Sequence, residues 1–493
     1  MPEVHLTFVN TIKHKAVNAM IWSGVERLSS QLIRFGIGVI LARLLMPAEF
    51  GLIGMLAIFM GVAQVFVNCG FGEGLIQKQK TSHRDECSVF YLNIAFGVFA
   101  AAVLYVAAPQ IAQFYHQPIL TSLTRLMALD VAINSFGIVQ TMLLTKEIDF
   151  KTQLKVSVIA TLISGGIAVG MAVQGFGVLS LAAQVLIGDT LRVIFLWAFH
   201  GWRPSAVFSF ASLLELLPYG SRMFASGLLN SIFTEIYSLV IGRIYAPATL
   251  GLFTRAKQMQ QLPVDNLCNI VGRVSFPVFA SVQHDKALLK RGVRKAARGL
   301  VMINFPLLIG LAVVARPLVL VLLTEKWEAC VPYIQLLCVG GALYPLSLIH
   351  LNALAAMGRS DLFLRLEIIK KVMVAISIAI TYRYGVKGLL IGDIVVSIVS
   401  CYLNSFYSVR LISYSWKEQI LDLLPYLGIS ALMGACVWLV GGMPNWGGNV
   451  GQLAVELTCG IVIYLLCCRF CRLSAFSEAC EVISGRIPGW NPA

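Results

Sequence analysis

Charged side chains are scarce in this sequence. Only 13% of its 493 residues are Asp, Glu, Lys or Arg, whereas soluble domains contain about 25%. Apolar residues make up 58% of the chain, and the mean hydropathy is +0.80. This composition excludes a soluble enzyme, a disordered chain and a nucleic-acid-binding protein, despite the net charge of +14. It is typical of a polytopic membrane protein, in which basic residues gather in cytoplasmic loops.

Motifs for catalysis and energy conversion are also missing. The chain has no G-x-x-x-x-G-K-[ST] sequence, so we do not expect it to hydrolyse ATP. Its seven histidines do not cluster, and Cys468 and Cys471 form a single C-x-x-C without a second pair or a nearby histidine. We therefore expect no catalytic residue, no metal and no cofactor, and we interpret the chain as a transporter rather than an enzyme.

Long apolar runs dominate the sequence. A hydrocarbon core of about 30 Å requires about 20 apolar residues per helix, and we place fourteen such segments. They lie at about 18–44, 49–72, 88–108, 122–144, 154–174, 176–199, 216–244, 251–279, 299–323, 331–357, 371–384, 387–407, 422–441 and 450–468. The eleventh is short, and no gap between segments could hold a folded domain. The predicted fold class is an all-α polytopic membrane protein with about 14 transmembrane helices.

Lys and Arg in the short loops predict the orientation. With the N-terminus inside, the cytoplasmic segments carry about 24 of these residues, whereas the opposite side carries only Lys326, Arg383 and Lys387. This asymmetry satisfies the positive-inside rule. We expect a multi-pass membrane protein with both termini in the cytoplasm.

An internal repeat recurs at an offset of 200 residues. The stretch Leu41–Leu52 aligns with Ile241–Leu252, and five of the twelve pairs are identical, including the shared Arg-x-x-x-Pro-Ala. Six helices per repeat preserve orientation, so the duplication is parallel. We predict an N-terminal segment (1–17), a six-helix N-lobe (18–199), a linker (200–215), a six-helix C-lobe (216–407), a terminal hairpin (408–468) and a tail (469–493). A substrate cavity between two such lobes is the arrangement of a transporter.

The first apolar segment contains charges. Glu26, Arg27 and Arg34 lie within it, and Arg27, Gln31 and Arg34 share one helical face. A charge at the centre of a membrane helix costs about 2.5–3.5 kcal/mol, so this face is expected to line a hydrated cavity. The alternative is that Glu26 and Arg27 lie at the cytoplasmic interface and extend their charges into water.

The eighth segment is the most polar. Its polar side chains between 255 and 273 are Arg255, Lys257, Gln258, Gln260, Gln261, Asp265, Asn266, Asn269 and Arg273. Such a helix cannot face lipid, and Pro263 should kink it where protein or water satisfies the freed backbone groups. We predict that it lines a cationic cavity suited to an anionic or phosphate-bearing substrate.

Isolated acids elsewhere are candidates for ion coupling. Asp130, Asp189 and Glu235, together with Glu26, could bind a coupling proton or sodium ion. Asp189 could equally pair with Arg192, and Asp130 with Arg125. A separate basic stretch, from Lys286 to Arg298, is expected to be a cytoplasmic loop. It could contact anionic lipid or a phosphorylated substrate, or it could simply anchor the topology.

Several motifs together resemble a known family. Gly70-Phe71-Gly72-Glu73-Gly74-Leu75-Ile76-Gln77 is followed by Tyr91-Leu92-Asn93, Gly251-Leu252-Phe253-Thr254-Arg255-Ala256, Leu262-Pro263-Val264, Gly272-Arg273-Val274-Ser275-Phe276-Pro277 and Glu325-Lys326-Trp327. In order and spacing they resemble the polysaccharide transporter family of oligosaccharide flippases, closest to the colanic-acid-exporter type, over residues 17–470. Phe253 and Lys257 depart from the Tyr-Ser-Arg-Ala-Tyr-like stretch expected there, which leaves the identity of the substrate open.

The resemblance implies membership of the multidrug/oligosaccharidyl-lipid/polysaccharide exporter superfamily and a location in the bacterial inner membrane. It further implies alternating access and a polyprenyl-pyrophosphate-linked oligosaccharide as cargo, for exopolysaccharide, capsule or lipopolysaccharide O-antigen. The expected partners are that lipid-linked cargo, the bilayer and a polysaccharide polymerase or copolymerase. Two alternatives remain open: a cation-coupled multidrug efflux pump of the same fold, and a membrane polysaccharide ligase or polymerase.

Overall fold

The computed structural model describes residue 24 and residues 29–78, 81–443 and 447–483. In this part of the chain the regular structure is entirely helical, with no β-strand. Within these described residues, eleven helical stretches are long and apolar enough to cross a membrane. The predicted fold class, an all-α polytopic membrane protein, is confirmed.

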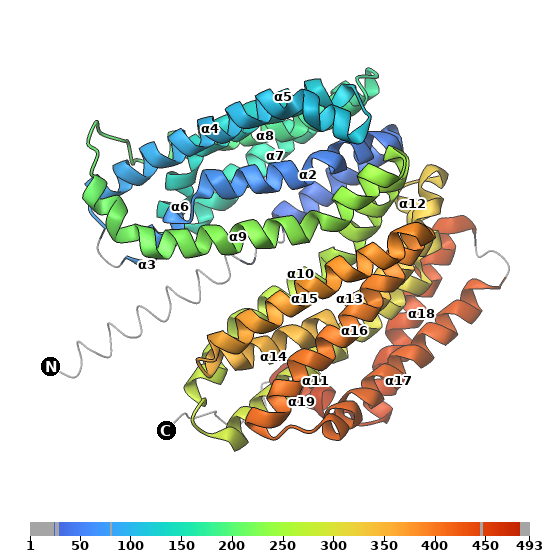
Figure 1. The fold of residues 1–493 in the computed structure, drawn as a ribbon. Helices are drawn as coiled ribbons and strands as arrows, with labels where there is room; N and C mark the ends of the chain where they lie inside the picture. The colour runs from blue at the N-terminus through green and yellow to red at the C-terminus, as the bar shows by residue number, and fades with distance from the viewer. Residues whose placement is uncertain (1–23, 25–28, 79–80, 444–446, 484–493) are drawn as a thin grey trace. The chain divides into compact units, whose positions relative to one another are not determined.

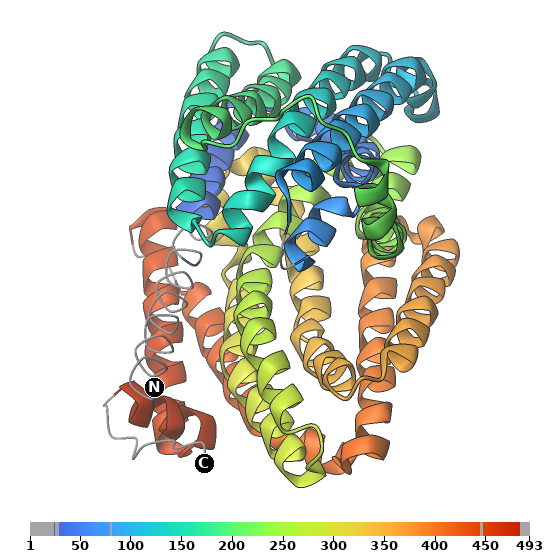
Figure 2. The same cartoon turned by 90° about the vertical axis from the view of Figure 1, so that its left-hand side faces the viewer.

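The helices correspond to the predicted segments. The stretch Asp361–Ile412 comprises two helices, α15 and α16, which pack against each other across a turn at Gly385 (Figure 2). Two predicted segments are outside the eleven stretches. One is α10 (Pro247–Ser281), the predicted polar helix, which runs as one helix through both Pro263 and Pro277. The other is the first segment, which is helical over residues 29–44. The eleventh predicted segment is longer than expected, since α15 begins at Ser360.

The chain divides into two compact units, Met1–Gly251 and Leu252–Ala493. After the helix over 29–44, the first unit contains α2 (Pro47–Asn68), α3 (Phe71–Gln77), α4 (His83–Tyr115), α5 (Ile119–Asn134), α6 (Ile138–Lys146), α7 (Phe150–Val173), α8 (Val178–Phe199) and α9 (Phe210–Ile244), with the 3-10 turn η1 (Ser135–Gly137) between α5 and α6. Most of α10 belongs to the second unit, but its first turn belongs to the first.

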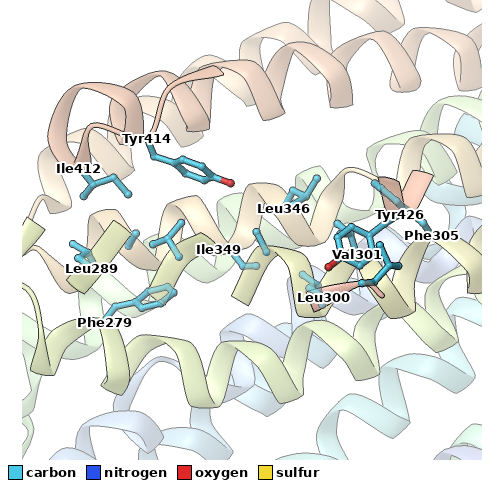
Figure 3. Packing of buried hydrophobic residues seen from close by; sticks show 14 of the residues in the cluster. Phe279, Leu289, Leu300, Val301, Phe305, Leu346, Ile349, Ile412, Tyr414 and Tyr426 are labelled. Atoms are coloured by element: carbon cyan, nitrogen blue, oxygen red, sulfur yellow. The ribbon is translucent and has the colours of Figure 1, made fainter. Parts of the chain in front are cut away.

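The second unit continues with α11 (Lys286–Val313), α12 (Ala315–Leu322), the 3-10 helix η2 (Glu325–Cys330), α13 (Val331–Gly341), α14 (Tyr344–Ala356), α15 (Ser360–Thr381), the 3-10 turn η3 (Tyr382–Tyr384), α16 (Gly385–Ile412), α17 (Trp416–Gly441), α18 (Gly448–Phe470) and α19 (Ser474–Ile483). An apolar core of this unit joins α11 to α14 and includes Leu300, Phe305 and Ile349, with Tyr414 and Tyr426 from the terminal part of the chain (Figure 3).

Helix α9 packs within the first unit, although the repeat assigns it to the second lobe. It lies beside α2 (Figure 1), where the rings of Phe66 and Phe224 meet edge to face at 5.1 Å between centroids. Near its start, Lys78 bridges Glu215 of α9 and Asp85 of α4, with Nζ to carboxylate distances of 2.9 and 3.0 Å. The hydrogen bonds to Glu215 and then Asp85 raise the pKa of Lys78. The boundary between the lobes at residue 216, which was inferred from the sequence repeat, stays a prediction.

The two copies of the repeat meet in space. Gly51 lies in the first turns of α2 and Gly251 in those of α10, and both belong to the first unit. A Cβ atom on Gly51 would lie 1.8 Å from the carbonyl oxygen of Pro247, and one on Gly251 would lie 1.8 Å from that of Pro47. The contact is therefore reciprocal and made by backbone atoms. Only glycine permits it, because any side chain would overlap a carbonyl that cannot turn away.

This contact predicts a large effect of a small substitution. Gly51→Ala should destabilise the protein by about 2–3 kcal/mol, because overpacking against backbone forces the helices to shift. The matched control is Gly166→Ala in α7, where an added Cβ meets nothing within 4 Å and alanine should be neutral or slightly stabilising. Thermal unfolding of the purified variants in detergent checks both. Equal unfolding temperatures for the two variants would contradict the backbone contact.

The basic stretch is a helix rather than the loop expected from the sequence. Residues 286–298 form the first half of α11, because Asp285 caps its N-terminus by accepting hydrogen bonds from the backbone N–H groups of Ala287 and Leu288. Four of its six basic side chains pair with acids of α17 and α19: Lys290 with Glu418, Arg294 and Arg298 with Asp422, and Lys295 with Glu478. The ion pairs of this stretch therefore connect α11 to α17 and α19.

Candidate functional site

A cluster of charged side chains lies inside the first unit. Arg34 comes from the first helix, Asp130 from α5, and Asp189 and Arg192 from α8. Asp189 interacts electrostatically with Arg192, with Arg34 and with Asp130. The Arg34 side chain is exposed in the structure. Since an arginine at membrane depth cannot face lipid tails without a large cost, this exposed face suits water or a polar ligand.

Asp130 is the most deeply buried member of this cluster. Only 3% of it is exposed, and its Oδ1 atom makes no hydrogen bond. The predicted alternative, in which Asp130 pairs with Arg125, is not what the structure shows: the Arg125 guanidinium stacks on the ring of Tyr105, 4.8 Å from its centroid. Asp130 instead interacts with Asp189. When two carboxyl groups share a low-dielectric site, their negative charges repel each other. Binding a proton or another cation between them is therefore favourable.

Polar side chains of α10 separate onto two faces. Gln258, Asp265 and Asn269 are exposed and share one side of the helix, as their spacing of seven and four residues requires. Lys257 is half-buried and interacts electrostatically with Asp265. Asn266 and Asn269 donate to the carbonyls of Leu262 and Asp265, at 2.8 and 2.7 Å. The exposed face therefore offers amide and carboxylate groups that could bind sugar hydroxyls.

Arg255, one helical turn before Gln258, is buried rather than exposed. It is only 6% exposed, and its Nη1 donates to Oε1 of Gln258 at 2.7 Å. Its guanidinium carbon is 5.9 Å from the ring centroid of Trp327, a fully buried side chain of η2. The Trp of the Glu325-Lys326-Trp327 motif is thus the aromatic neighbour of a predicted site arginine.

The remaining predicted site residues are placed as follows. Glu26 and Arg27 lie outside the described residues, and Arg273 lies on α10 without a described side chain. Gln31 is half-buried on the first helix. Glu235 lies on α9, where its Oε2 accepts a hydrogen bond from Ser238 at 2.8 Å. Among the described residues, no three or more His, Cys, Asp or Glu side chains gather as metal ligands.

Sequence reasoning missed the ionic cluster around Asp422. Asp422 is 5% exposed and accepts hydrogen bonds from both Arg294 and Arg298, and from the Tyr414 hydroxyl at 2.8 Å. A signal was available, because Glu418 and Asp422 are one helical turn apart and the basic stretch 286–298 needs counter-charges. Nothing in the sequence showed that these two segments, more than 120 residues apart, would meet.

A family model described as "Polysaccharide biosynthesis protein" matches residues 40–332. The chain belongs to this family. The polysaccharide biosynthesis family predicted from the motifs is thereby confirmed.

Individual relatives agree with the family match. The chain is 31% identical to the teichuronic acid biosynthesis protein TuaB of Bacillus subtilis over 61% of its own length and 62% of that protein, somewhat under two thirds. It is 26% identical to the lipopolysaccharide biosynthesis protein WzxC of Escherichia coli, covering 86% of this chain and 87% of WzxC. It is also 26% identical to the succinoglycan biosynthesis transport protein ExoT of Rhizobium meliloti, over 98% and 99% of the two chains.

Solved structures share the fold of this family member. The lipid II flippase MurJ in an inward closed conformation matches with a TM-score of 0.76 and 15% identity, over 92% of this chain and 99% of MurJ. An inward-facing multidrug resistance MATE transporter of the MOP superfamily matches with a TM-score of 0.62 and 18% identity, over 80% and 99%. At these identities the likeness shows the fold alone.

Proposed function

We propose that this protein moves a polyprenyl-pyrophosphate-linked oligosaccharide repeat unit from the cytoplasmic to the periplasmic leaflet of the bacterial inner membrane by alternating access. The observation that carries the proposal is the exposed Arg34 inside a membrane protein of the polysaccharide biosynthesis family. A cation within a membrane segment is costly, and an anionic cargo that pairs with it would offset this cost. The names of ExoT, a transport protein, and of MurJ, a flippase, together with the fold shared with MurJ, support a transporter.

In this proposal, charge and hydrogen bonding act on different parts of the cargo. Arg34 neutralises the pyrophosphate, together with Arg27, Arg255, Lys257 and Arg273 as the cycle exposes them. The amide and carboxylate groups of α10, Gln258, Asp265, Asn266 and Asn269, with Gln31 of the first helix, bind sugar hydroxyls. The polyprenyl tail stays in lipid. An arginine guanidinium can donate two parallel hydrogen bonds to the oxygens of one phosphate. Such a bidentate contact orients the cargo as well as neutralising its charge.

Ion coupling is proposed at the Asp130 and Asp189 pair. Both acids lie in the first unit, and Asp130 carries a buried oxygen without a hydrogen-bond partner. A proton or sodium ion there would relieve the repulsion between the carboxylates and change the field at Arg34, since Asp189 interacts with both. Glu26 and Glu235 remain the other candidates from the sequence. Both termini are proposed to be cytoplasmic, and a polysaccharide polymerase or copolymerase is the proposed partner.

The decisive experiment follows lipid-linked intermediates in a strain that lacks the gene. We expect a pyrophosphate-linked oligosaccharide to accumulate in the cytoplasmic leaflet while polymer export stops. Reconstitution of the purified protein with that extracted lipid, under an imposed proton or sodium gradient, would identify the coupling ion. Accumulation in the periplasmic leaflet would instead indicate a ligase or polymerase. No accumulation, together with new drug sensitivity, would indicate a multidrug efflux pump.

A further inference from the structure

Helix α9 carries polar side chains along one side, although it is apolar enough to cross a membrane. The side toward α2 is packed, since the ring of Phe224 meets that of Phe66 (Figure 1). A second side is apolar and exposed, and it includes Phe210, Leu214 and Leu217. The remaining side carries four exposed polar residues at intervals of four, which we call the polar line: Arg222, Ser226, Asn230 and Thr234. A step of four residues turns the position by about 40° around a helix, so the polar line winds slowly along α9.

The polar line is suited to water rather than to lipid. Ser226 and Asn230 make no side-chain hydrogen bond within the part of the chain that the structure describes. An amide or hydroxyl without a hydrogen-bond partner in hydrocarbon costs free energy, and polar residues of membrane helices face the bundle interior or a water-filled cavity. The hydroxyl of Ser226 and the amide of Asn230 are therefore available to a hydrophilic ligand.

Arg222 is the cation of the polar line. Its guanidinium forms no ion pair with any acid that the structure describes. By contrast, Lys78 near the start of α9 is held by Glu215 and Asp85. Arg222 lies six residues, or about 9 Å, beyond residue 216, where the predicted apolar segment begins. With the N-terminus proposed to be cytoplasmic, this end of α9 is the inner one, and a long arginine side chain at this depth reaches the level of the lipid phosphates.

We propose that the polar line of α9 is the entry site for the cargo, where Arg222 binds the pyrophosphate and Ser226 and Asn230 bind the first sugars. This inference rests on the proposed function. The pyrophosphate of a polyprenyl carrier lies at the headgroup level while its tail is in the bilayer, so an exposed cation at that level meets it first. Arg34 lies sixteen residues, or about 24 Å, into its own predicted segment, which begins at residue 18. The two cations of the first unit thus bind the pyrophosphate at successive depths.

The competing explanation is that Arg222 binds the phosphate of ordinary anionic lipids. Both ligands offer the same chemistry, a phosphate at the membrane surface. They differ because the cargo also carries sugars, which reach the rest of the polar line when the pyrophosphate is bound at Arg222. The test therefore uses a carrier lipid with and without sugars, and it includes an anionic phospholipid as a competitor.

The first arm measures binding of undecaprenyl pyrophosphate to the purified full-length protein in nanodiscs of phosphatidylcholine. We expect Arg222→Ala to weaken binding by about tenfold, the scale of one hydrogen bond to a charged group. Arg84→Ala is the matched control, because Arg84 is an exposed arginine near the start of α4 with no role in the proposed mechanism. An excess of phosphatidylglycerol should leave the difference between the two variants in place. Equal affinities of the two variants, or a difference that phosphatidylglycerol abolishes, would overturn the proposal.

The second arm measures binding of the pyrophosphate-linked oligosaccharide extracted from the strain that lacks the gene. Ser226→Ala should weaken this binding by about fivefold, the scale of a lost neutral hydrogen bond, and should leave binding of undecaprenyl pyrophosphate unchanged. The matched control is Ser221→Ala, since Ser221 is an exposed serine on the apolar side of α9. Equal affinities of the two serine variants for the oligosaccharide would show that the polar line does not bind sugar, and the entry site would be wrong.

The variant Arg34→Ala separates this inference from the function on which it rests. If Arg34→Ala weakens binding of undecaprenyl pyrophosphate while Arg222→Ala binds it normally, the entry site is wrong and the proposed function stands. If the natural protein binds neither the carrier lipid nor the extracted oligosaccharide, both are overturned.

Discussion

Replacing Arg34 by alanine is expected to abolish polymer export while the protein remains in the membrane at normal abundance. Arg34 is exposed in the structure and interacts electrostatically with Asp189 rather than supporting the core. A hydrogen bond to a charged group contributes about 1.5–3 kcal/mol, so losing the contact between Arg34 and the anionic cargo should lower the transport rate by about a hundredfold. Arg34→Lys, which keeps the charge but loses the planar fork, should retain part of the activity.

Arg125→Ala is the matched control for this prediction. Arg125 is another arginine of the first unit, but it stacks on Tyr105 and has no role in the proposed mechanism. Export is measured as surface polymer in a strain lacking the gene, and the lipid-linked intermediate is quantified in parallel. We expect the intermediate to accumulate with Arg34→Ala and not with Arg125→Ala. Normal export by Arg34→Ala would rule out this arginine as the group that neutralises the cargo.

Replacing Asp422 by asparagine is expected to destabilise the terminal helices by about 3 kcal/mol. The Asp422 carboxylate is 5% exposed and accepts hydrogen bonds from Arg294, Arg298 and Tyr414. Removing one partner from a buried ion pair typically costs about 3–5 kcal/mol; we take the lower end because the two arginines are partly exposed. Asparagine keeps the shape but removes the charge and one of the acceptor oxygens.

Thermal unfolding in detergent and limited proteolysis of the C-terminal part measure this effect. The control is Asp361→Asn, which removes the acid from an exposed ion pair with Arg359 and should change stability little. Earlier cleavage after α16 in the Asp422 variant would show that α17 has loosened from α11. Unfolding temperatures that match between the two variants would mean that the cluster does not hold these helices together.

The character of each helix was predictable because lipid imposes strict rules on sequence. A membrane segment must be long, apolar and hydrogen-bonded within itself, so the runs that became α2, α7 and α18 were visible as hydropathy alone. The polar α10 stood out for the same reason. Boundaries were less certain where a charged helix continues out of the apolar run, as at the start of α11 and of α15.

The partners of the site residues were less predictable. Arg34 and Asp189 were each identified as charges in apolar segments, yet their interaction joins residues far apart in sequence. The burial of Arg255 against Trp327 depends on the fold of η2, which hydropathy does not describe. For Asp130, the nearest arginine in the sequence is Arg125. The Arg125 guanidinium instead makes a cation–π contact with the ring of Tyr105.

By itself, the sequence determined that this chain is a helical membrane protein, that residues 41–52 recur at 241–252 and that cations lie within its apolar segments. These properties follow from local composition and spacing, because transfer into lipid is decided residue by residue. Only the tertiary structure decided which charges interact: Arg34 lies within electrostatic reach of Asp189, and Arg294 forms an ion pair with Asp422. It also brought Gly51 against Pro247. Such contacts depend on how helices distant in the chain pack together, and packing is decided by the shapes of all neighbours at once.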